Sequence, residues 1–249
     1  MRVVPSPLMS DQLEPIRRLV KRFLFALAAN DINRYLKLRS KIADFLYWAG
    51  LYEQANLSSL REFIKPGDTV VDVGASFGIY TRELLKLVGP KGKVYAFEPL
   101  KEVFNLLSAK VPASLNLHLV NAALGSEACA ALSIKVPLIS GGIPEPALAT
   151  LGDPGLNYSE ETVKVMRLDD LICDLSGLTF IKVDVEGKEM DFLQGARESI
   201  IKFRPVVQFE LNDPGRLPEF QSFAQTLGYS AVSPSPGSIN YYLIPNKKS

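Results

Sequence analysis

Apolar residues along this chain follow two different spacings, and the spacing changes near residue 57. Within residues 11–29 apolar side chains recur at intervals of three and four, which predicts one face of a helix. The same spacing over residues 32–46 predicts a second helix. From about residue 57, short β-branched runs alternate with helical stretches. We therefore expect a helical N-terminal extension over residues 1–56 and a separate domain over residues 57–249.

Alternating strands and helices are typical of a parallel sheet with helices on both faces. The predicted strands are residues 69–73, 93–97, 117–122, 179–185 and 205–211, and helical periods fill residues 79–88, 100–110, 188–203 and 218–227. The end of the chain differs, because two apolar runs flank a turn-rich Pro-Ser-Pro-Gly-Ser sequence. We expect this terminal hairpin to add an antiparallel strand, which gives a doubly wound, Rossmann-like α/β sheet.

Residues 136–160 interrupt the alternation with four prolines and four glycines. A loop of this length in a compact domain is usually functional or disordered. The segment follows the third-strand region and precedes the fourth strand, so it is tethered beside the carboxyl ends of the strands. We expect a lid without regular structure; a disordered surface insertion is the alternative. The apolar residues expected to close over a substrate are Ile139, Ile143, Leu148, Leu151 and Leu156.

The net charge of the chain is nearly neutral, but the charges are unevenly distributed along it. The net charge is +1, which does not favour nucleic acid as the main partner. Residues 1–65 carry 11 Lys/Arg against 6 Asp/Glu, and residues 66–249 carry 17 against 21, so a basic N-terminal part precedes a mildly acidic domain. Its helices are expected to pack on the domain, with a membrane surface or a partner as the alternative contact.

Cysteine content and hydropathy bear on the compartment. Cys129 and Cys173 have no spacing typical of a zinc site or a disulfide framework, which fits a reducing compartment such as the cytoplasm. No apolar run approaches the roughly 20 residues that a membrane span needs. We therefore expect a cytoplasmic protein without a transmembrane segment. The sequence leaves its oligomeric state open.

The strongest local motif is VVDVGASFGIYTREL at residues 70–84, where a strand runs into Gly74 and Gly78 and a helix follows at once. Glycines at such a turn let a ligand approach the backbone closely, at the edge where open α/β sheets bind ligands. The next strand ends at Glu98, whose carboxylate can accept hydrogen bonds from both hydroxyls of a ribose. Its position, 20 residues after Gly78, also suits a nicotinamide dinucleotide.

Three features favour S-adenosylmethionine over a dinucleotide. The turn is G-x-x-x-G and lacks the close second glycine that accommodates a pyrophosphate. Asp72 precedes the turn and suits an ammonium group better than a phosphate, and the terminal hairpin suits a methyltransferase sheet. Asn121, after the third strand, could bond an adenine or cap a turn. The expected cofactor-binding residues are Asp72, Gly74, Ala75, Ser76, Gly78, Tyr80, Glu98, Pro99, Asn121 and Ala122. A turn without a ligand and another nucleotide-type cofactor are the alternatives.

The predicted fourth strand carries three ionisable residues on one face: Lys182, Asp184 and Glu186. Such residues are costly in a covered parallel strand unless they are paired or wet. Either this face opens to a cleft, or the three residues form a salt-bridged structural set. Glu210 on the next strand repeats the pattern.

These four residues are also the candidates for catalysis. A hydroxyl acceptor usually needs a base to remove its proton. The only histidine, His118, begins the third strand, at the wrong end of the sheet, and is expected to be structural. Asp184 and Glu186 are therefore the first candidates, with Lys182 and Glu210 behind them. The two carboxylates could instead hold Mg²⁺, but we expect no metal.

The motifs together resemble the FkbM family of methyltransferases over roughly residues 50–212. The matching stretches are VVDVGASFGIYT (70–81), KVYAFEPLKEVFNLL (93–107), NAALG (121–125), VMRLDDL (165–171), FIKVDVEGKEMDFLQGA (180–196) and RPVVQFEL (204–211). The order DVGAxxG, AFEP, IKxDVEG is specific, although each motif alone is weak. Ser76 departs from the pattern, because the family usually has Asn there.

This resemblance implies a class I methyltransferase fold, S-adenosylmethionine as cofactor, and methylation of a hydroxyl oxygen on a sugar, polyketide or other small metabolite. The expected partner is thus a small-molecule acceptor and not nucleic acid. The resemblance says little about residues 1–49, 136–160 and 213–249, where an acceptor would be selected. Two other functions stay open: a non-catalytic cofactor-binding module and an NAD(P)-dependent oxidoreductase.

Overall fold

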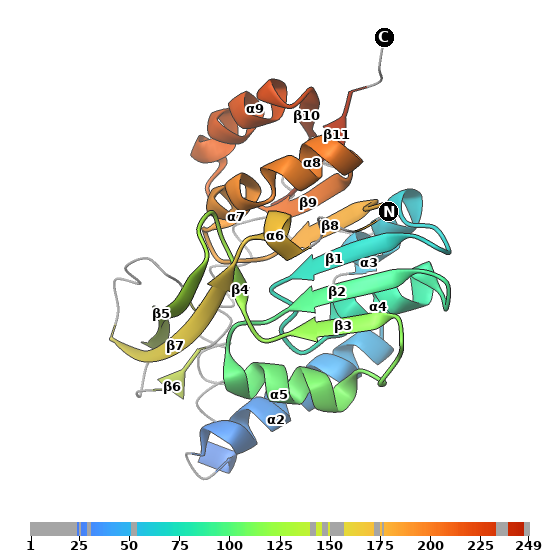
Figure 1. Ribbon diagram of the computed structural model, residues 1–249. Helices are drawn as coiled ribbons and strands as arrows, with labels where there is room; N and C mark the ends of the chain where they lie inside the picture. The colour runs from blue at the N-terminus through green and yellow to red at the C-terminus, as the bar shows by residue number, and fades with distance from the viewer. Residues whose placement is uncertain are drawn as a thin grey trace, which may run out of the picture.

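The computed structural model describes residues 24, 26–28, 31–50, 54–139, 143–145, 149, 157–171, 175, 177–232 and 239–246. Most of the helix expected within residues 11–29 lies outside this part of the chain. The described residues form a large central sheet with helices on both faces and a smaller sheet beside one of its edges (Figure 1).

The central sheet has the strand order β10-β11-β9-β8-β1-β2-β3. Its strands are β1 (Thr69–Val73), β2 (Lys93–Phe97), β3 (Leu117–Val120), β8 (Phe180–Val183), β9 (Val206–Glu210), β10 (Tyr229–Val232) and β11 (Asn240–Pro245). Strands β3, β2, β1, β8 and β9 pair in parallel, whereas β11 pairs antiparallel with both β9 and β10. The expected doubly wound sheet with an antiparallel C-terminal hairpin is therefore confirmed.

Strand β1 lies inside the sheet between β8 and β2, at the point where the strand order reverses. Its Asp72 is in register with Ala96 on β2 and with Lys182 on β8. The carboxyl ends of β1, β2 and β8 therefore meet at one edge of the sheet, which is the usual ligand position in open α/β folds.

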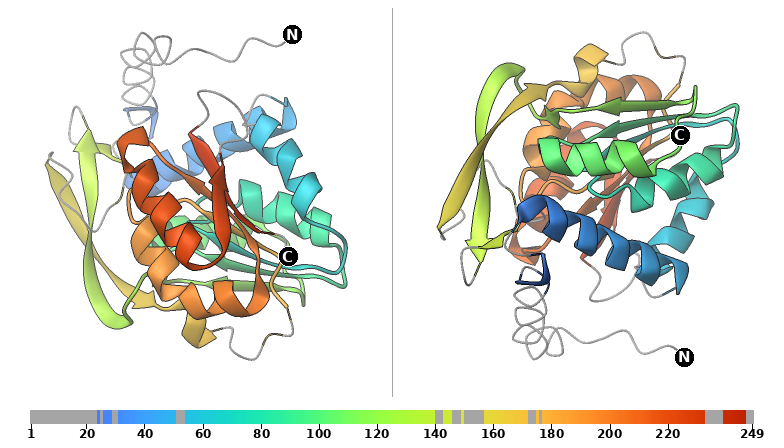
Figure 2. Two further views of the ribbon diagram at one scale, coloured as in Figure 1. Left: turned by 90° about the horizontal axis from the view of Figure 1, so that it is seen from above. Right: turned by 90° about the horizontal axis from the view of Figure 1, so that it is seen from below.

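Helices cover both faces of this sheet (Figure 2). Helices α7, α8 and α9 lie on one face, and α2, α3, α4 and α5 lie on the other. The bounds are α2 (Ile32–Trp48), α3 (Gln54–Phe63), α4 (Ile79–Val88), α5 (Lys101–Lys110), α6 (Leu168–Leu171), α7 (Glu189–Gly195), α8 (Arg197–Phe203), the 3₁₀ turn η2 (Pro214–Arg216) and α9 (Leu217–Thr226). Residues 70–73 of β1 are all buried because helices cover both sides.

The region between β3 and β8 departs from our expectation. It contains β4 (Ala123–Leu124), β5 (Cys129–Ile139), β6 (Ile143–Pro144) and β7 (Tyr158–Met166), in a second sheet of order β4-β7-β5-β6. Strands β5 and β7 form a long antiparallel pair, so residues 136–139, 143–144 and 158–160 have regular structure. The prediction of a segment without regular structure is wrong there. Leu148, Leu151 and Leu156 lie outside the described residues.

Alternating burial explains this pair of strands. Ile134 and Val136 on β5 are buried, and so are Val163 and Val165 on β7, whereas residues between them are more exposed. This period of two is typical of a strand. The prolines and glycines nearby predicted irregular structure instead.

Helix α2 packs against the domain beside this second sheet. Its Tyr35 and Leu36 are buried together with Val103 of α5 and Ile134 of β5. Asp44 forms ion pairs with Arg82 of α4 and Lys110 of α5. The α2 helix therefore forms part of the wall around the carboxyl edge of the main sheet. Within the described residues, no helix combines the length and the apolar character needed to cross a lipid bilayer.

Candidate functional site

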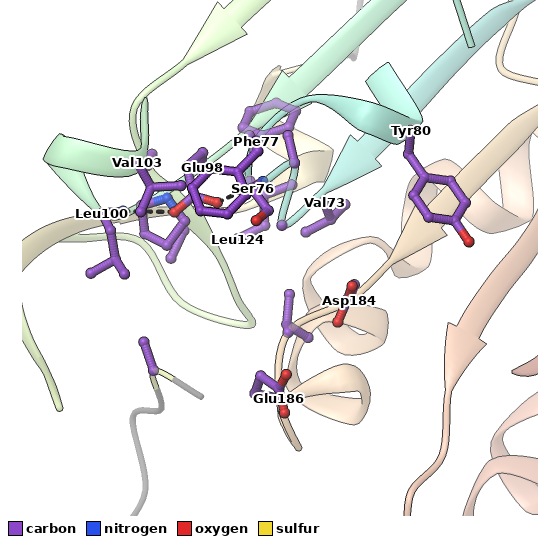
Figure 3. A pocket seen from close by; sticks show the side chains of 18 of the residues that line it. Val73, Ser76, Phe77, Tyr80, Glu98, Leu100, Val103, Leu124, Asp184 and Glu186 are labelled. Carbon is purple, nitrogen blue, oxygen red and sulfur yellow. Dashed lines mark hydrogen bonds between the residues drawn. The ribbon is translucent and has the colours of Figure 1, made fainter. Parts of the chain in front are cut away.

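A cavity of about 220 Å³ lies at the carboxyl ends of β1, β2 and β8 (Figure 3). Four segments line it: residues 73–77 with 79–80, residues 97–100, residues 122–124, and the end of β8 with the turn after it. Arg39 of α2 and Ile134 of β5 add a further wall. The cavity therefore combines the glycine turn, the acid after β2 and the charged strand in one place.

The turn after β1 is held tightly against its neighbours. The N–H groups of Gly74 and Ala75 both donate to the carbonyl of Phe97, at 3.0 and 2.9 Å. Gly74 has a φ of +76°, and a Cβ added to it would collide with the carbonyl oxygen of Asp184. Only glycine fits here, because the turn and the end of β8 touch through their backbones.

Gly78 and Ser76 complete this turn in different ways. Gly78 precedes α4 with a φ of +79°, and a Cβ there would press on Leu107 and Val111 of α5. It packs against α5 and is not among the residues that line the cavity. Ser76 lines the cavity at a φ of +49°, a conformation that costs energy for a side chain other than Asn or Gly.

Glu98 lines the cavity directly after β2. Its carboxylate accepts the N–H of Ser76 at 2.9 Å and the N–H of Leu100 at 3.0 Å. Burial raises the pKa of Glu98 to about 7, although these two N–H groups lower it. A carboxylate has about four lone-pair sites, so two remain for further donors. Glu98 thus fits the two hydroxyls of a ribose.

Asn121 holds the backbone of the segment that contains Glu98. Its side-chain nitrogen donates to the carbonyls of Glu98 and Pro99, both at 2.9 Å. Among the described residues, Pro99 and Ala122 line the cavity and Asn121 does not. This arrangement favours the turn-capping alternative for Asn121, and a direct bond to an adenine stays a prediction.

Asp72 is fully buried beneath the turn and does not belong to the cavity lining. It accepts the hydroxyl of Thr81 at 2.6 Å, which ties the end of β1 to α4. Its Oδ1 atom makes no hydrogen bond within the described part of the chain. One acceptor position therefore remains at Asp72, and its expected role toward an ammonium group stays a prediction.

The charged strand is both paired and open to the cavity. Lys182 lies 3.0 Å from Asp184, and its Nζ lies 4.5 Å from the ring centre of Tyr80. Burial lowers the pKa of Lys182, but the carboxylates of Asp184, Asp72 and Glu210 raise it above its ordinary value. All of these except Asp72 and Glu210 line the cavity. Lys182 is thus a cation surrounded by carboxylates, and Glu210 raises its pKa from outside the cavity.

Glu186 differs from its two charged neighbours because it makes no hydrogen bond or ion pair within the described residues. It lines the cavity just after β8, at a φ of +47°. Burial, with a smaller effect of the nearby carboxylates of Asp184, Glu189 and Glu145, raises the pKa of Glu186 to about 7. A carboxylate with this pKa is divided between its two protonation states near neutral pH, as a general base requires.

Metal binding and a histidine base are the two other chemistries that the sequence raises. Within the described residues, no group of three His, Cys, Asp or Glu side chains gathers closely enough to hold a metal ion. The ring of His118 stacks on Tyr95 at 4.4 Å and lies away from the cavity lining.

The residues that α2 and the second sheet bring to the cavity were not predicted from the sequence. Arg39, Ile134 and Ala149 line it, and Glu145 pairs with Arg39 just behind. The alternation along β5 could have revealed Ile134. Nothing local in the sequence connects Arg39 with Glu145.

Comparisons with known proteins agree with this geometry. Residues 72–235 match the family described as the methyltransferase FkbM domain. The 31-O-demethyl-FK506 methyltransferase FkbM of Streptomyces tacrolimicus is 29% identical over an alignment 219 residues long, which covers 77% of this chain and 83% of that protein. The mitochondrial rRNA methyltransferase 2 of Schizosaccharomyces pombe is 37% identical over 75 residues, or 30% of this chain.

A solved structure of methyltransferase FkbM from Methylobacillus flagellatus KT aligns with a TM-score of 0.49 and 17% identity, over 94% of this chain and 60% of that one. The aligned part of the rRNA methyltransferase is 34% of its length, so this chain matches about a third of that protein. The family match covers well over half of the chain, and it contains the turn, Glu98 and the charged strand. This protein therefore belongs to the FkbM methyltransferase domain family.

Proposed function

We propose that this chain transfers the methyl group of S-adenosylmethionine to a hydroxyl oxygen of a small molecule, with Glu186 as the general base. The observation that carries the proposal is the position of Glu186 in the same cavity as Glu98, with a pKa raised to about 7. Family membership supports methyl transfer. The name of the Streptomyces relative denotes an acceptor that lacks a methyl group on an oxygen, which supports O-methylation.

The residues around the cavity fit this cofactor. Glu98 would hold the ribose. Asp72 lies buried beneath the turn, and its Oδ1, which no described residue bonds, would accept a hydrogen bond from the ammonium group. The apolar side chains of Leu100, Ala122 and Leu124 would surround the adenine. When bound, S-adenosylmethionine supplies a methyl group already activated by its sulfonium, so that the chain chiefly has to orient the acceptor.

The residues of this chain would then manage one proton. Transfer of the methyl group to the acceptor oxygen would release S-adenosylhomocysteine and leave the hydroxyl proton to be taken up by the chain. The hydroxyl proton passes to the carboxylate of Glu186. Lys182 holds the carboxylate of Asp184 in an ion pair, so the carboxylate of Glu186 is the one left to accept the proton.

The proposal is tested with labelled S-adenosylmethionine and two acceptor pools: the small-molecule extract of the native cells and purified rRNA. We expect label in the small molecules, and a rate that rises with pH through about 7. Glu186→Gln should lower the rate about 100-fold and leave the affinity for S-adenosylhomocysteine nearly unchanged. Glu160→Gln, on an exposed residue of β7, is the control and should transfer like wild type.

Several results would contradict the proposal. Label only in rRNA would replace the acceptor class, and wild-type rates in Glu186→Gln would remove the base. Thermal shifts with NAD or NADP that exceed those with S-adenosylhomocysteine would indicate an oxidoreductase. Binding of S-adenosylhomocysteine without transfer to either pool would indicate a cofactor-binding module.

A further inference from the structure

An ion pair joins α2 to the second sheet at the wall of the cavity. Arg39 of α2 donates through one terminal nitrogen to the carboxylate of Glu145, 106 positions later in the chain. The Arg39 side chain is 20% exposed and lines the cavity, whereas the Glu145 side chain is fully buried. The N–H of Glu145 donates to the carbonyl of Pro137 at 2.9 Å, which holds this glutamate beside β5.

The guanidinium of Arg39 is oriented on a second side as well. Its central carbon lies 5.6 Å from the ring centre of Tyr35, which is fully buried one helical turn earlier. Held between a ring and a carboxylate, Arg39 has a defined orientation. A guanidinium has five N–H donors, so one bond to Glu145 leaves others for a ligand.

Two of the three cations in the described lining of the cavity are paired with a carboxylate, and the acids of the lining balance the third. Lys182 pairs with Asp184, and Arg39 pairs with Glu145. Lys188 follows Glu186 by two residues. Glu98 adds one more acid to the lining. The described part of the cavity wall therefore offers hydrogen-bond donors and acceptors without surplus positive charge.

We propose that Glu145 determines acceptor specificity by cancelling the charge of Arg39, so that the cavity takes uncharged, oxygen-bearing acceptors and rejects those with a phosphate or carboxylate. The proposal rests on the proposed function and names the substrate class of the same site. Carbonyl and hydroxyl oxygens can accept the remaining N–H donors of Arg39. An anion that accepted the same N–H donors would lie beside the carboxylate of Glu145 and would also face the carboxylates of Asp184 and Glu186, which repel it.

The first test uses inorganic phosphate as the probe. Potassium phosphate is titrated calorimetrically, at constant ionic strength, into the full chain with and without S-adenosylhomocysteine. Wild type should show no saturable binding up to about 20 mM, whereas Glu145→Gln should bind phosphate with a Kd of about 1 mM, because its Arg39 has lost its partner. Glu145→Asp keeps the charge and should behave like wild type.

A double variant connects any new phosphate site to Arg39. Phosphate binding gained in Glu145→Gln should vanish in the double variant Arg39→Met/Glu145→Gln. Phosphate binding by wild type that Arg39→Met removes would overturn the proposal. A folded Glu145→Gln variant without phosphate binding would overturn it too.

A second measurement needs only wild type, in case the variants fail to fold. The labelled product is passed over an anion-exchange resin at about pH 8, where phosphates and carboxylates are ionised. We expect it in the flow-through; retention as an anion would overturn the proposal. Absence of both cofactor binding and labelled product would instead refute the proposed function, and the phosphate titration without cofactor would still decide the charge balance.

Discussion

The cavity has two sides: the glycine turn with Glu98, where we propose the cofactor (the cofactor side), and Arg39 with Ile134 and Glu145, where we propose the acceptor (the acceptor side). On the cofactor side, hydrogen bonds join residues that lie near one another in the sequence. Thr81 bonds to Asp72 nine positions away, Ser76 to Glu98 across 22 positions, and Asn121 to Glu98 across 23. On the acceptor side, Arg39 and Glu145 are 106 positions apart. The hydrogen bonds on the cofactor side thus join consecutive strand–turn–helix units, and β8 adds one distant contact there, between the backbones of Gly74 and Asp184. The acceptor side forms only where α2 meets the second sheet. Four changes separate the two sides, from the largest expected effect to the smallest.

Gly74→Ala should break the cofactor side most strongly. Its Cβ would collide with the backbone oxygen of Asp184, and its φ of +76° is strained for alanine. We expect a loss of about 3 kcal/mol in unfolding free energy and at least a ~100-fold weaker affinity for S-adenosylhomocysteine. Chemical unfolding and calorimetry measure both.

Gly67→Ala is the matched control. Gly67 has a φ of +96°, but nothing lies within 4 Å of a Cβ there. It should cost only the conformational part, about 1–2 kcal/mol, with normal cofactor affinity. Equal losses of affinity in both variants would show that the contact with Asp184 is unimportant.

Glu98→Gln should change how stability depends on pH. Burial raises the pKa of Glu98 from 4.5 to about 7 in the folded chain. Protonated Glu98 therefore favours the folded state. That contribution is fully present below pH 4.5 and is lost as pH rises through about 7, by up to about 3 kcal/mol. Relative to wild type, Glu98→Gln should gain stability over this window in urea unfolding. Parallel pH curves would contradict the assigned burial.

Ile134→Ala should weaken the acceptor side alone. Ile134 lines the cavity, whereas Val163, buried in the same sheet, does not. Removing either side chain should cost about 2 kcal/mol of stability. Methyl transfer should fall about 10-fold in Ile134→Ala, because a misplaced acceptor reacts slowly, and stay near wild type in Val163→Ala. S-adenosylhomocysteine affinity should hold in both variants. A similar loss of transfer in Val163→Ala would assign the effect to the sheet as a whole.

Ser76→Asn should have the smallest effect, and a favourable one. Ser76 has a φ of +49°, which asparagine tolerates better, so the turn should gain a few tenths of a kcal/mol. A melting temperature higher by about 1–2 °C would agree with this. Cofactor affinity should not change, because Ser76 bonds to Glu98 through its backbone N–H. A lower melting temperature would show that the serine hydroxyl matters.

The fold could be predicted because its signals are local. The apolar runs of β1, β2, β8 and β9 and the helical periods between them imply the doubly wound sheet, and the final apolar pair implies the antiparallel strand. The β5–β7 pair was missed because its two strands are separated by a stretch rich in proline and glycine. Their alternation was present, at Ile134 and Val136, but the paired residues lie 27 and 23 positions later in the chain.

The sequence by itself determined the elements of the main sheet and the strand–turn–helix at Gly74, since each depends on backbone geometry within a few residues; the contact of Gly74 with Asp184 came from the assembled sheet. Tertiary structure alone decided what the acids near the cavity do. The pKa of Glu186 depends on burial and on Asp184, Glu189 and Glu145 around it. The charge balance of Arg39 depends on a glutamate on another element. Electrostatic interactions follow distance and burial in three dimensions, and neither can be read from separation along the chain.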